Sequence, residues 1–96
     1  CGAVKGACDD VQLGNITPLL SKIKPAVNAV TEPSEPSERT SANKSFVQDV
    51  VYKNVHMTIE KMKRNSAVLT EMEDAGEITI VGAVYDVGSG KVDFLD

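Results

Sequence analysis

An almost continuously apolar run near the end of the chain constrains the fold most strongly. Residues 78–86, Ile-Thr-Ile-Val-Gly-Ala-Val-Tyr-Asp, are rich in β-branched side chains. Such a run is typical of a strand covered on both faces, as in a parallel sheet lined by helices. Asp86, Gly88 and Gly90 then predict a short reversing loop. The return run, residues 91–95, begins with alternating polar and apolar side chains, which predicts an antiparallel edge strand.

The segments upstream of this strand pair are predicted to be helices able to cover such a sheet. Residues 1–11 place apolar side chains on one helical face, with Gly14 as the expected stop. Thr17 and Pro18 predict the N-cap and first residue of a second helix, which Pro25 restricts near its end. The expected apolar stripe of that helix is Ile16, Leu19, Leu20, Ile23 and Val27.

Two further helices are predicted before the strands. Ser45 and Gln48 have the spacing of a capping box at the start of the first. The second runs from about residue 67 to 75, between the cap Ser66 and the closing Gly76. The predicted core positions of these helices are Val47, Val50, Val51, Val55, Ile59, Met62, Val68, Leu69 and Met72.

We predict a single partial domain over residues 1–96. A helical segment, 1–30, is followed by a flexible connector, 31–45, and then by helices and a terminal strand pair over 46–96. The connector holds two Glu-Pro-Ser repeats and no Val, Leu, Ile or aromatic residue. It therefore cannot bury enough apolar surface to offset the entropy lost on ordering.

Two strands make a poor sheet by themselves, so the sequence predicts strand edges without pairing partners and apolar helix faces without a covering layer. Open strand edges and uncovered apolar helix faces favour association, and we expect a homo-oligomer. A net charge of −4 argues against a nucleic-acid partner. The sequence contains no run of 18 apolar residues, so no membrane span is predicted, and no signal peptide is visible. A cytoplasmic location is expected, with a periplasmic one left open because the natural N-terminus is not visible.

Most side chains that could take part in catalysis or ligand binding are explained by a structural role. His56, the sole histidine, lies on the flank of an apolar helix face. Asp9 and Asp10 are adjacent on a helix and do not face each other, which favours a solvated helix end. Tyr85 is a strand-end packing residue, with a ligand contact left open. Gly82 inside a strand predicts a close approach by another group.

Cys1 and Gly2 form the most informative site. Cys1 and Cys8 on one helix lie about 10 Å apart along its axis. A disulfide needs Cα atoms within about 7 Å, so no bridge is expected. A thiolate at a helix start is stabilised by the positive end of the helix, which suits a reactive or metal-binding cysteine. Local physics alone still favours a plain cysteine, because no second ligand is in sight.

Several segments, in order along nearly the whole chain, carry a family resemblance. They are Cys-Gly-Ala-Val-Lys-Gly-Ala at residues 1–7, Leu-Gly-Asn-Ile at 13–16, Leu-Leu at 19–20, Lys-Ile-Lys-Pro-Ala-Val at 22–27, Asn-Val at 54–55, Ile-Val-Gly-Ala-Val-Tyr-Asp at 80–86, Gly-Lys-Val at 90–92 and Phe-Leu at 94–95. Together they resemble the C-terminal half of a β-class carbonic anhydrase. The resemblance implies an α/β fold, in which helices cover a mostly parallel sheet with a C-terminal antiparallel edge hairpin.

The resemblance also implies a zinc site. In that family two cysteines and a histidine hold the metal. Cys1 matches the cysteine of the His-x-x-Cys motif, and Gly2 matches the glycine whose backbone N–H faces the site. The histidine and the Cys-x-Asp-x-Arg motif would lie upstream of residue 1. We therefore expect a fragment that holds one ligand of three and is inactive alone.

The implied activity is zinc-dependent reversible hydration of CO2 to bicarbonate and a proton, a reaction for which carbonic anhydrase is itself the type example. CO2 and bicarbonate are the expected partners. The alternative is a non-catalytic α/β interaction module or dimerisation domain. A histidine three residues before Cys1, with Cys-x-Asp-x-Arg further back, would decide for the enzyme.

Overall fold

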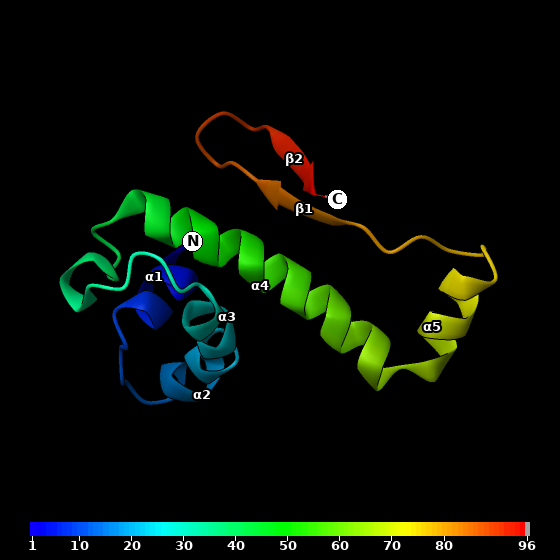
Figure 1. Cartoon of the computed structure of the whole chain (residues 1–96), viewed down its shortest axis with the longest axis horizontal. Coiled ribbons are helices and arrows are strands. Elements are labelled where there is room, and N and C mark those ends of the chain that lie inside the picture. Colours follow the sequence, from blue (N-terminus) through cyan, green and yellow to red (C-terminus); the bar gives the residue numbers. More distant parts are fainter. Residues whose placement is uncertain (96) are drawn as a thin grey trace. The chain divides into compact units, whose positions relative to one another are not determined.

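Five α-helices, one 3-10 helix and two strands make up the computed structural model, which describes residues 1–95 (Figure 1). Their order is α1 (Gly2–Cys8), α2 (Ile16–Ser21), α3 (Lys24–Ala29), η1 (Pro36–Glu38), α4 (Lys44–Asn65), α5 (Ala67–Asp74), β1 (Gly82–Tyr85) and β2 (Val92–Leu95). The chain divides within α4 into two units, Cys1–Asn54 and Val55–Asp96. Over the described range, no helix combines the length and the apolar character needed to cross a membrane.

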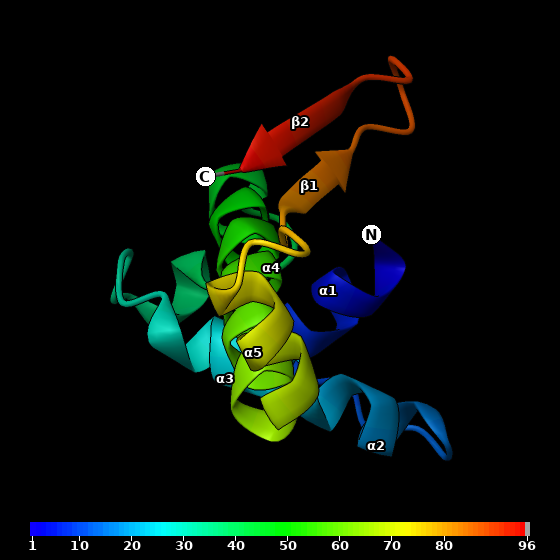
Figure 2. The same cartoon turned by 90° about the vertical axis from the view of Figure 1, so that its right-hand side faces the viewer.

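The core of the first unit forms where α1, α2 and α3 group together (Figures 1 and 2). The first turns of α4 supply Phe46 and Val50, both fully buried. The other buried apolar residues of this unit are Val4, Ala7, Cys8, Leu20, Ala26, Val27, Val30 and Val47. The predicted core positions Val47 and Val50 are thus confirmed, whereas Phe46 was not anticipated.

Helix α1 ends earlier than predicted. Asp10 adopts a left-handed conformation, with φ of 55°. The Val11 N–H donates to the Gly6 carbonyl and the Asp10 N–H donates to the Ala7 carbonyl. These two bonds form a Schellman motif with Asp10 in the position that glycine usually fills. Gly14 also has a positive φ, 46°, but it lies in the turn before α2, so its assignment as the helix stop was wrong.

The second predicted helix is in fact two. Asn15 precedes α2, and Thr17 lies inside that helix, where its hydroxyl accepts a hydrogen bond from the Leu13 N–H. Pro25 lies in the first turn of α3, so it helps to begin a helix rather than to restrict one. Of the predicted stripe, only Leu20 and Val27 are buried, and Ile23 is half-buried.

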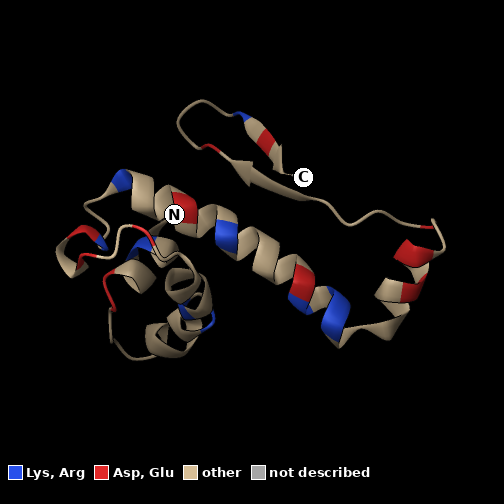
Figure 3. Cartoon of the chain, viewed as in Figure 1, with Lys and Arg blue, Asp and Glu red and all other residues tan. Residues whose placement is uncertain are grey.

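Helix α4 begins one residue before Ser45. The side-chain oxygen of Asn43 accepts a hydrogen bond from the Phe46 N–H at 3.2 Å, so Asn43 caps the helix in place of the predicted Ser45 and Gln48 pair. Basic residues, Lys63 and Arg64, occupy its last turn, where positive charge complements the helix dipole. Lys63 pairs with Glu73 of α5 at 2.6 Å. Figure 3 shows basic residues near the end of α4 and acidic residues on α5.

Both predicted ends of α5 are confirmed. The Ser66 hydroxyl accepts a hydrogen bond from the Leu69 N–H at 3.2 Å. Gly76, with φ of 76°, occupies the left-handed position of a second Schellman motif. The predicted burial along α5 was wrong, because no residue of this helix is buried and Val68 is 64% exposed.

The strand pair is an antiparallel hairpin, as its loop chemistry predicted. Gly82 pairs with Leu95 and Tyr85 pairs with Val92. The Asp86 side chain accepts hydrogen bonds from the Gly88 N–H and the Ser89 hydroxyl, which starts the turn and lowers the pKa of that carboxyl. Over residues 1–95 the sheet has only these two strands, so no parallel pairing is present.

The predicted coverage of both strand faces is not seen in this sheet. Val81 is 61% exposed and Phe94 is 70% exposed. Gly82 is buried, however, and a Cβ there would lie 2.5 Å from a methyl group of Val55 and 3.0 Å from one of Ile59. The predicted close approach at Gly82 is confirmed, and the approaching group is helix α4.

The connector, residues 31–45, carries its own hydrogen bonds. The Arg39 guanidinium donates to the carbonyls of Val27, Val30 and Pro33 at 2.9, 2.7 and 2.8 Å. Its central carbon lies 4.7 Å from the centre of the Phe46 ring. A charged side chain thus links a segment with little apolar surface to the core, and the flexibility of the connector stays a prediction.

Candidate functional site

The Cys1 thiol lies at the start of α1 and is exposed. Lys5 donates its N–H to the Cys1 carbonyl at 3.1 Å, which is the first hydrogen bond of the helix. Gly2 is also exposed, and no atom lies within 4 Å of where its Cβ would be. The first N–H groups of a helix have no partner inside it, so the Gly2 N–H is free of the helix ladder. This end of α1 can present a thiol and a backbone donor to the same ligand.

Cys8 has a different environment from Cys1. It is 7% exposed, and burial, followed by the neighbouring Asp9 carboxylate, raises the pKa of its thiol. Both cysteines are free thiols in the structure, Cys1 exposed and Cys8 buried. Of the two, only Cys1 has the access that a metal ligand or nucleophile needs.

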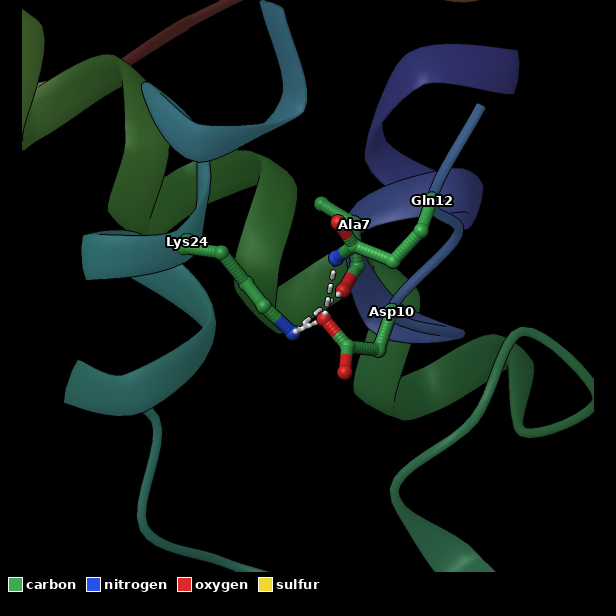
Figure 4. Close-up of polar contacts among 4 residues, drawn as sticks. All are labelled: Ala7, Asp10, Gln12 and Lys24. Atoms are coloured by element: carbon green, nitrogen blue, oxygen red, sulfur yellow. Dashed lines mark hydrogen bonds and ion pairs between the residues drawn. The ribbon is translucent and has the colours of Figure 1, made fainter. Parts of the chain in front are cut away.

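Polar contacts at the other end of α1 connect it to the rest of the first unit. The Lys24 ammonium, at the start of α3, lies 2.9 Å from the Asp10 carboxylate and donates to the Ala7 carbonyl at 3.2 Å (Figure 4). Gln12 donates to the same oxygen of Asp10. The ammonium lowers the pKa of Asp10 through its hydrogen bond and its charge.

Asp9 makes a separate connection. Both of its carboxylate oxygens accept hydrogen bonds from Ser41, one from the backbone N–H at 2.8 Å and one from the hydroxyl at 2.6 Å. These bonds lower the pKa of Asp9. Asp9 and Asp10 thus point to different partners, as expected for neighbours at a helix end, and each fastens α1 to another segment.

The described residues could supply part of a zinc site. Cys1 fits as one thiolate ligand by its chemistry and its exposure. No group of three His, Cys, Asp or Glu side chains within residues 1–95 could hold a metal ion. His56 is exposed on α4 with Glu60 one turn further on, also exposed, and no third ligand accompanies them in that range. These residues therefore do not form a complete zinc site.

Tyr85 does not have the packing role that the sequence suggested. It ends β1 and is 61% exposed. A contact between Tyr85 and a ligand stays a prediction.

Lys24, Arg39 and Ser41 were missed as organisers of the first unit. Lys24 and Arg39 bind backbone carbonyls, which leave no pattern of residue types to recognise. The opposite charges of Asp10 and Lys24 are a usable signal, but only once the turn between their helices is known.

A model of the carbonic anhydrase family matches residues 1–92 of the chain. The matched range begins at Cys1 and includes every helix and β1. No curated protein and no solved structure matches the chain. The family match confirms the resemblance that the ordered segments carried.

Proposed function

Because the chain belongs to the β-class carbonic anhydrase family, we propose that it serves the reversible hydration of CO2 to bicarbonate and a proton. The observation that carries the proposal is the family match over residues 1–92, which begins at an exposed, free cysteine. The proposed fold is the C-terminal part of the family's α/β fold. In it, the β1–β2 hairpin is the antiparallel edge of a mostly parallel sheet.

Cys1 and Gly2 are the residues of this chain that the proposal assigns to the site. The Cys1 thiolate would be one of three protein ligands of zinc, which activates a bound water as the nucleophile in such enzymes. The Gly2 N–H would face the same site as a hydrogen-bond donor. Residues 1–95 supply no complete ligand set, so the proposal includes two ligands from outside them.

Stopped-flow measurement of CO2 hydration by the intact natural protein tests this function. Cys1→Ala should reduce the rate to that of the uncatalysed reaction, because it removes a metal ligand. Cys8→Ala is the matched control, since Cys8 is a buried free thiol on the same helix and should leave the rate near that of the natural protein.

Two results would contradict the proposal. If the Cys1→Ala variant hydrated CO2 at the natural rate, Cys1 would not be a ligand of the catalytic zinc. Absence of hydration by the intact natural protein would favour the alternative, a non-catalytic interaction module with the same fold.

A further inference from the structure

The two ends of α1 are held very differently. We propose that Lys24, through its contacts with Ala7 and Asp10, is a positioning residue that sets the direction of α1 and thereby the place of the Cys1 thiol. The expected effect of Lys24 on zinc retention rests on the proposed function, whereas its expected effect on the orientation of α1 does not.

Helix α1 cannot fix its own direction. It has seven residues, and isolated helices shorter than about 12 residues are marginal in water. No side chain caps its first turn, and both Cys1 and Gly2 are exposed. Its buried residues, Val4, Ala7 and Cys8, make apolar contacts, which favour burial without a strong directional preference.

The last turn of α1, by contrast, has a directional attachment to α3. One ammonium group, that of Lys24, binds both a carbonyl of the helix and the side chain of Asp10, the residue in the left-handed position just beyond it. The Asp10 N–H returns to the same Ala7 carbonyl. The Lys24 side chain is 34% exposed and that of Asp10 is 64% exposed, so water screens the ion pair, whereas the hydrogen bond to the Ala7 carbonyl is part-buried. Hydrogen bonds to charged groups are directional and stronger than neutral ones.

The geometry converts a small change at this attachment into a large one at Cys1. A helix of seven residues is about 10 Å long, so a tilt of about 10° at its last turn moves its first residue by about 2 Å. A ligand constellation tolerates displacements of only about 0.5 Å. An attachment at the last turn can therefore decide whether the thiol is correctly placed.

Amide hydrogen exchange of the 96-residue chain tests the effect on α1. In Lys24→Met, which keeps the aliphatic stem, the Lys5 N–H should exchange about tenfold faster, as expected from losing a hydrogen bond to a charged group. Amides of α4 near Val50 should keep their rates. Lys24→Arg keeps the charge and the donors and should restore protection. Lys22→Met, an exposed neighbour at the end of α2, is the matched control.

Zinc release from the intact natural protein to a chelator tests the effect on the thiol. Lys24→Met should release zinc at least about tenfold faster than the natural protein, as is usual when a residue supporting a ligand is lost. Lys24→Arg and Lys22→Met should release it at about the natural rate.

Three results for Lys24→Met would overturn the proposal. The first is unchanged exchange of the Lys5 N–H, and the second is unchanged zinc release. The third is equally faster exchange in α1 and α4, which would indicate a general loss of stability. If the local acceleration in α1 is found but the intact natural protein contains no zinc, the positioning of α1 is supported and the proposed function fails.

Discussion

The Arg39 side chain binds three backbone carbonyls and lies over one aromatic ring. Its three carbonyl partners include those of Val27 and Val30, near the end of α3, where helix carbonyls lack partners inside the helix. Its guanidinium also stacks on Phe46, which is fully buried. A planar group with several fixed donors can make all these contacts at once. One residue thus compensates for the connector's lack of apolar surface.

We predict that Arg39→Lys destabilises the chain by about 2 kcal/mol, because an ammonium cannot span three carbonyls and leaves part-buried acceptors without a donor. The measurement is urea unfolding followed by circular dichroism. Arg64→Lys, at an exposed position in the last turn of α4, is the control and should leave the midpoint unchanged. Equal midpoints for the two variants would show that the Arg39 contacts contribute nothing specific.

Sequence reasoning at this scale succeeded where the residue type itself carries the signal. Ser66 and Gly76 were correctly placed, because a hydroxyl before a helix and a glycine after it have local causes. Asp10 was not placed in the left-handed position, because aspartate adopts this conformation much less often than glycine. Cys1 was recognised through the family resemblance, because nothing in its local sequence names a second ligand.

At the scale of elements, Gly82 allows β1 to approach α4 closely. Gly82→Ala should destabilise the chain by about 1–3 kcal/mol, because its Cβ would overlap Val55 and crowd Ile59. Thermal unfolding measures the effect. Gly88→Ala is the control, since the nearest atom to its Cβ would be a carboxylate oxygen of Asp86 at 3.6 Å. If both variants melt at the same temperature, the close approach at Gly82 does not exist in solution.

Glu73 links α5 to α4 and to the segment that precedes β1, and these links should be sensitive to acid. It pairs with Lys63 and accepts a hydrogen bond from the Ile80 N–H, and these contacts lower its pKa below the ordinary 4.5. A carboxyl with a lowered pKa in the folded state stabilises the fold above its unfolded pKa, and this contribution is lost as the pH falls through the lower, folded value.

We therefore expect the stability difference between the natural chain and Glu73→Gln to be present at pH 6 and to shrink as the pH falls below about 4.5. Chemical unfolding at several pH values measures it. Glu77→Gln, exposed beyond the end of α5, is the control for a general effect of removing one carboxylate. If the stability difference between the natural chain and Glu73→Gln stayed constant down to the lowest pH measured, the Glu73 carboxylate would make no pH-dependent contribution to stability.

The order and type of most elements were predictable, whereas their limits were not. The apolar period of residues 16–27 suits one continuous helix, but the chain ends α2 at Ser21 and begins α3 at Lys24, with Pro25 in the first turn of α3. Pro25 was correctly identified as a constraint and misjudged in direction, because proline is tolerated at a helix start. The parallel sheet was inferred from the apolar run alone, and over residues 1–95 that run pairs only with β2, in the antiparallel sense.

At the scale of the whole molecule, the hairpin exposes apolar side chains and unpaired edges. Val81, Val92 and Phe94 are each at least half exposed, and β1 and β2 pair only with one another over residues 1–95. We expect the chain to self-associate, because such edges and apolar patches favour pairing with a second copy.

Sedimentation velocity at tens of micromolar measures this association. Phe94→Ser should shift the distribution toward the monomer by removing an exposed ring from β2. Val68→Ser, which removes an exposed apolar side chain from α5, is the control outside the hairpin. A natural chain that sediments as a compact monomer would rule out the hairpin as an association surface.

The central claim is that these residues belong to a zinc enzyme and supply one of its three protein ligands. Its most direct test is the zinc content of the 96-residue chain after dialysis against a weak chelator, measured together with stopped-flow CO2 hydration. We predict that the chain retains no stoichiometric zinc and shows no hydration above background, because Cys1 alone cannot hold the metal. One zinc per chain, retained with activity, would mean that the missing ligands lie within these residues and would contradict the account.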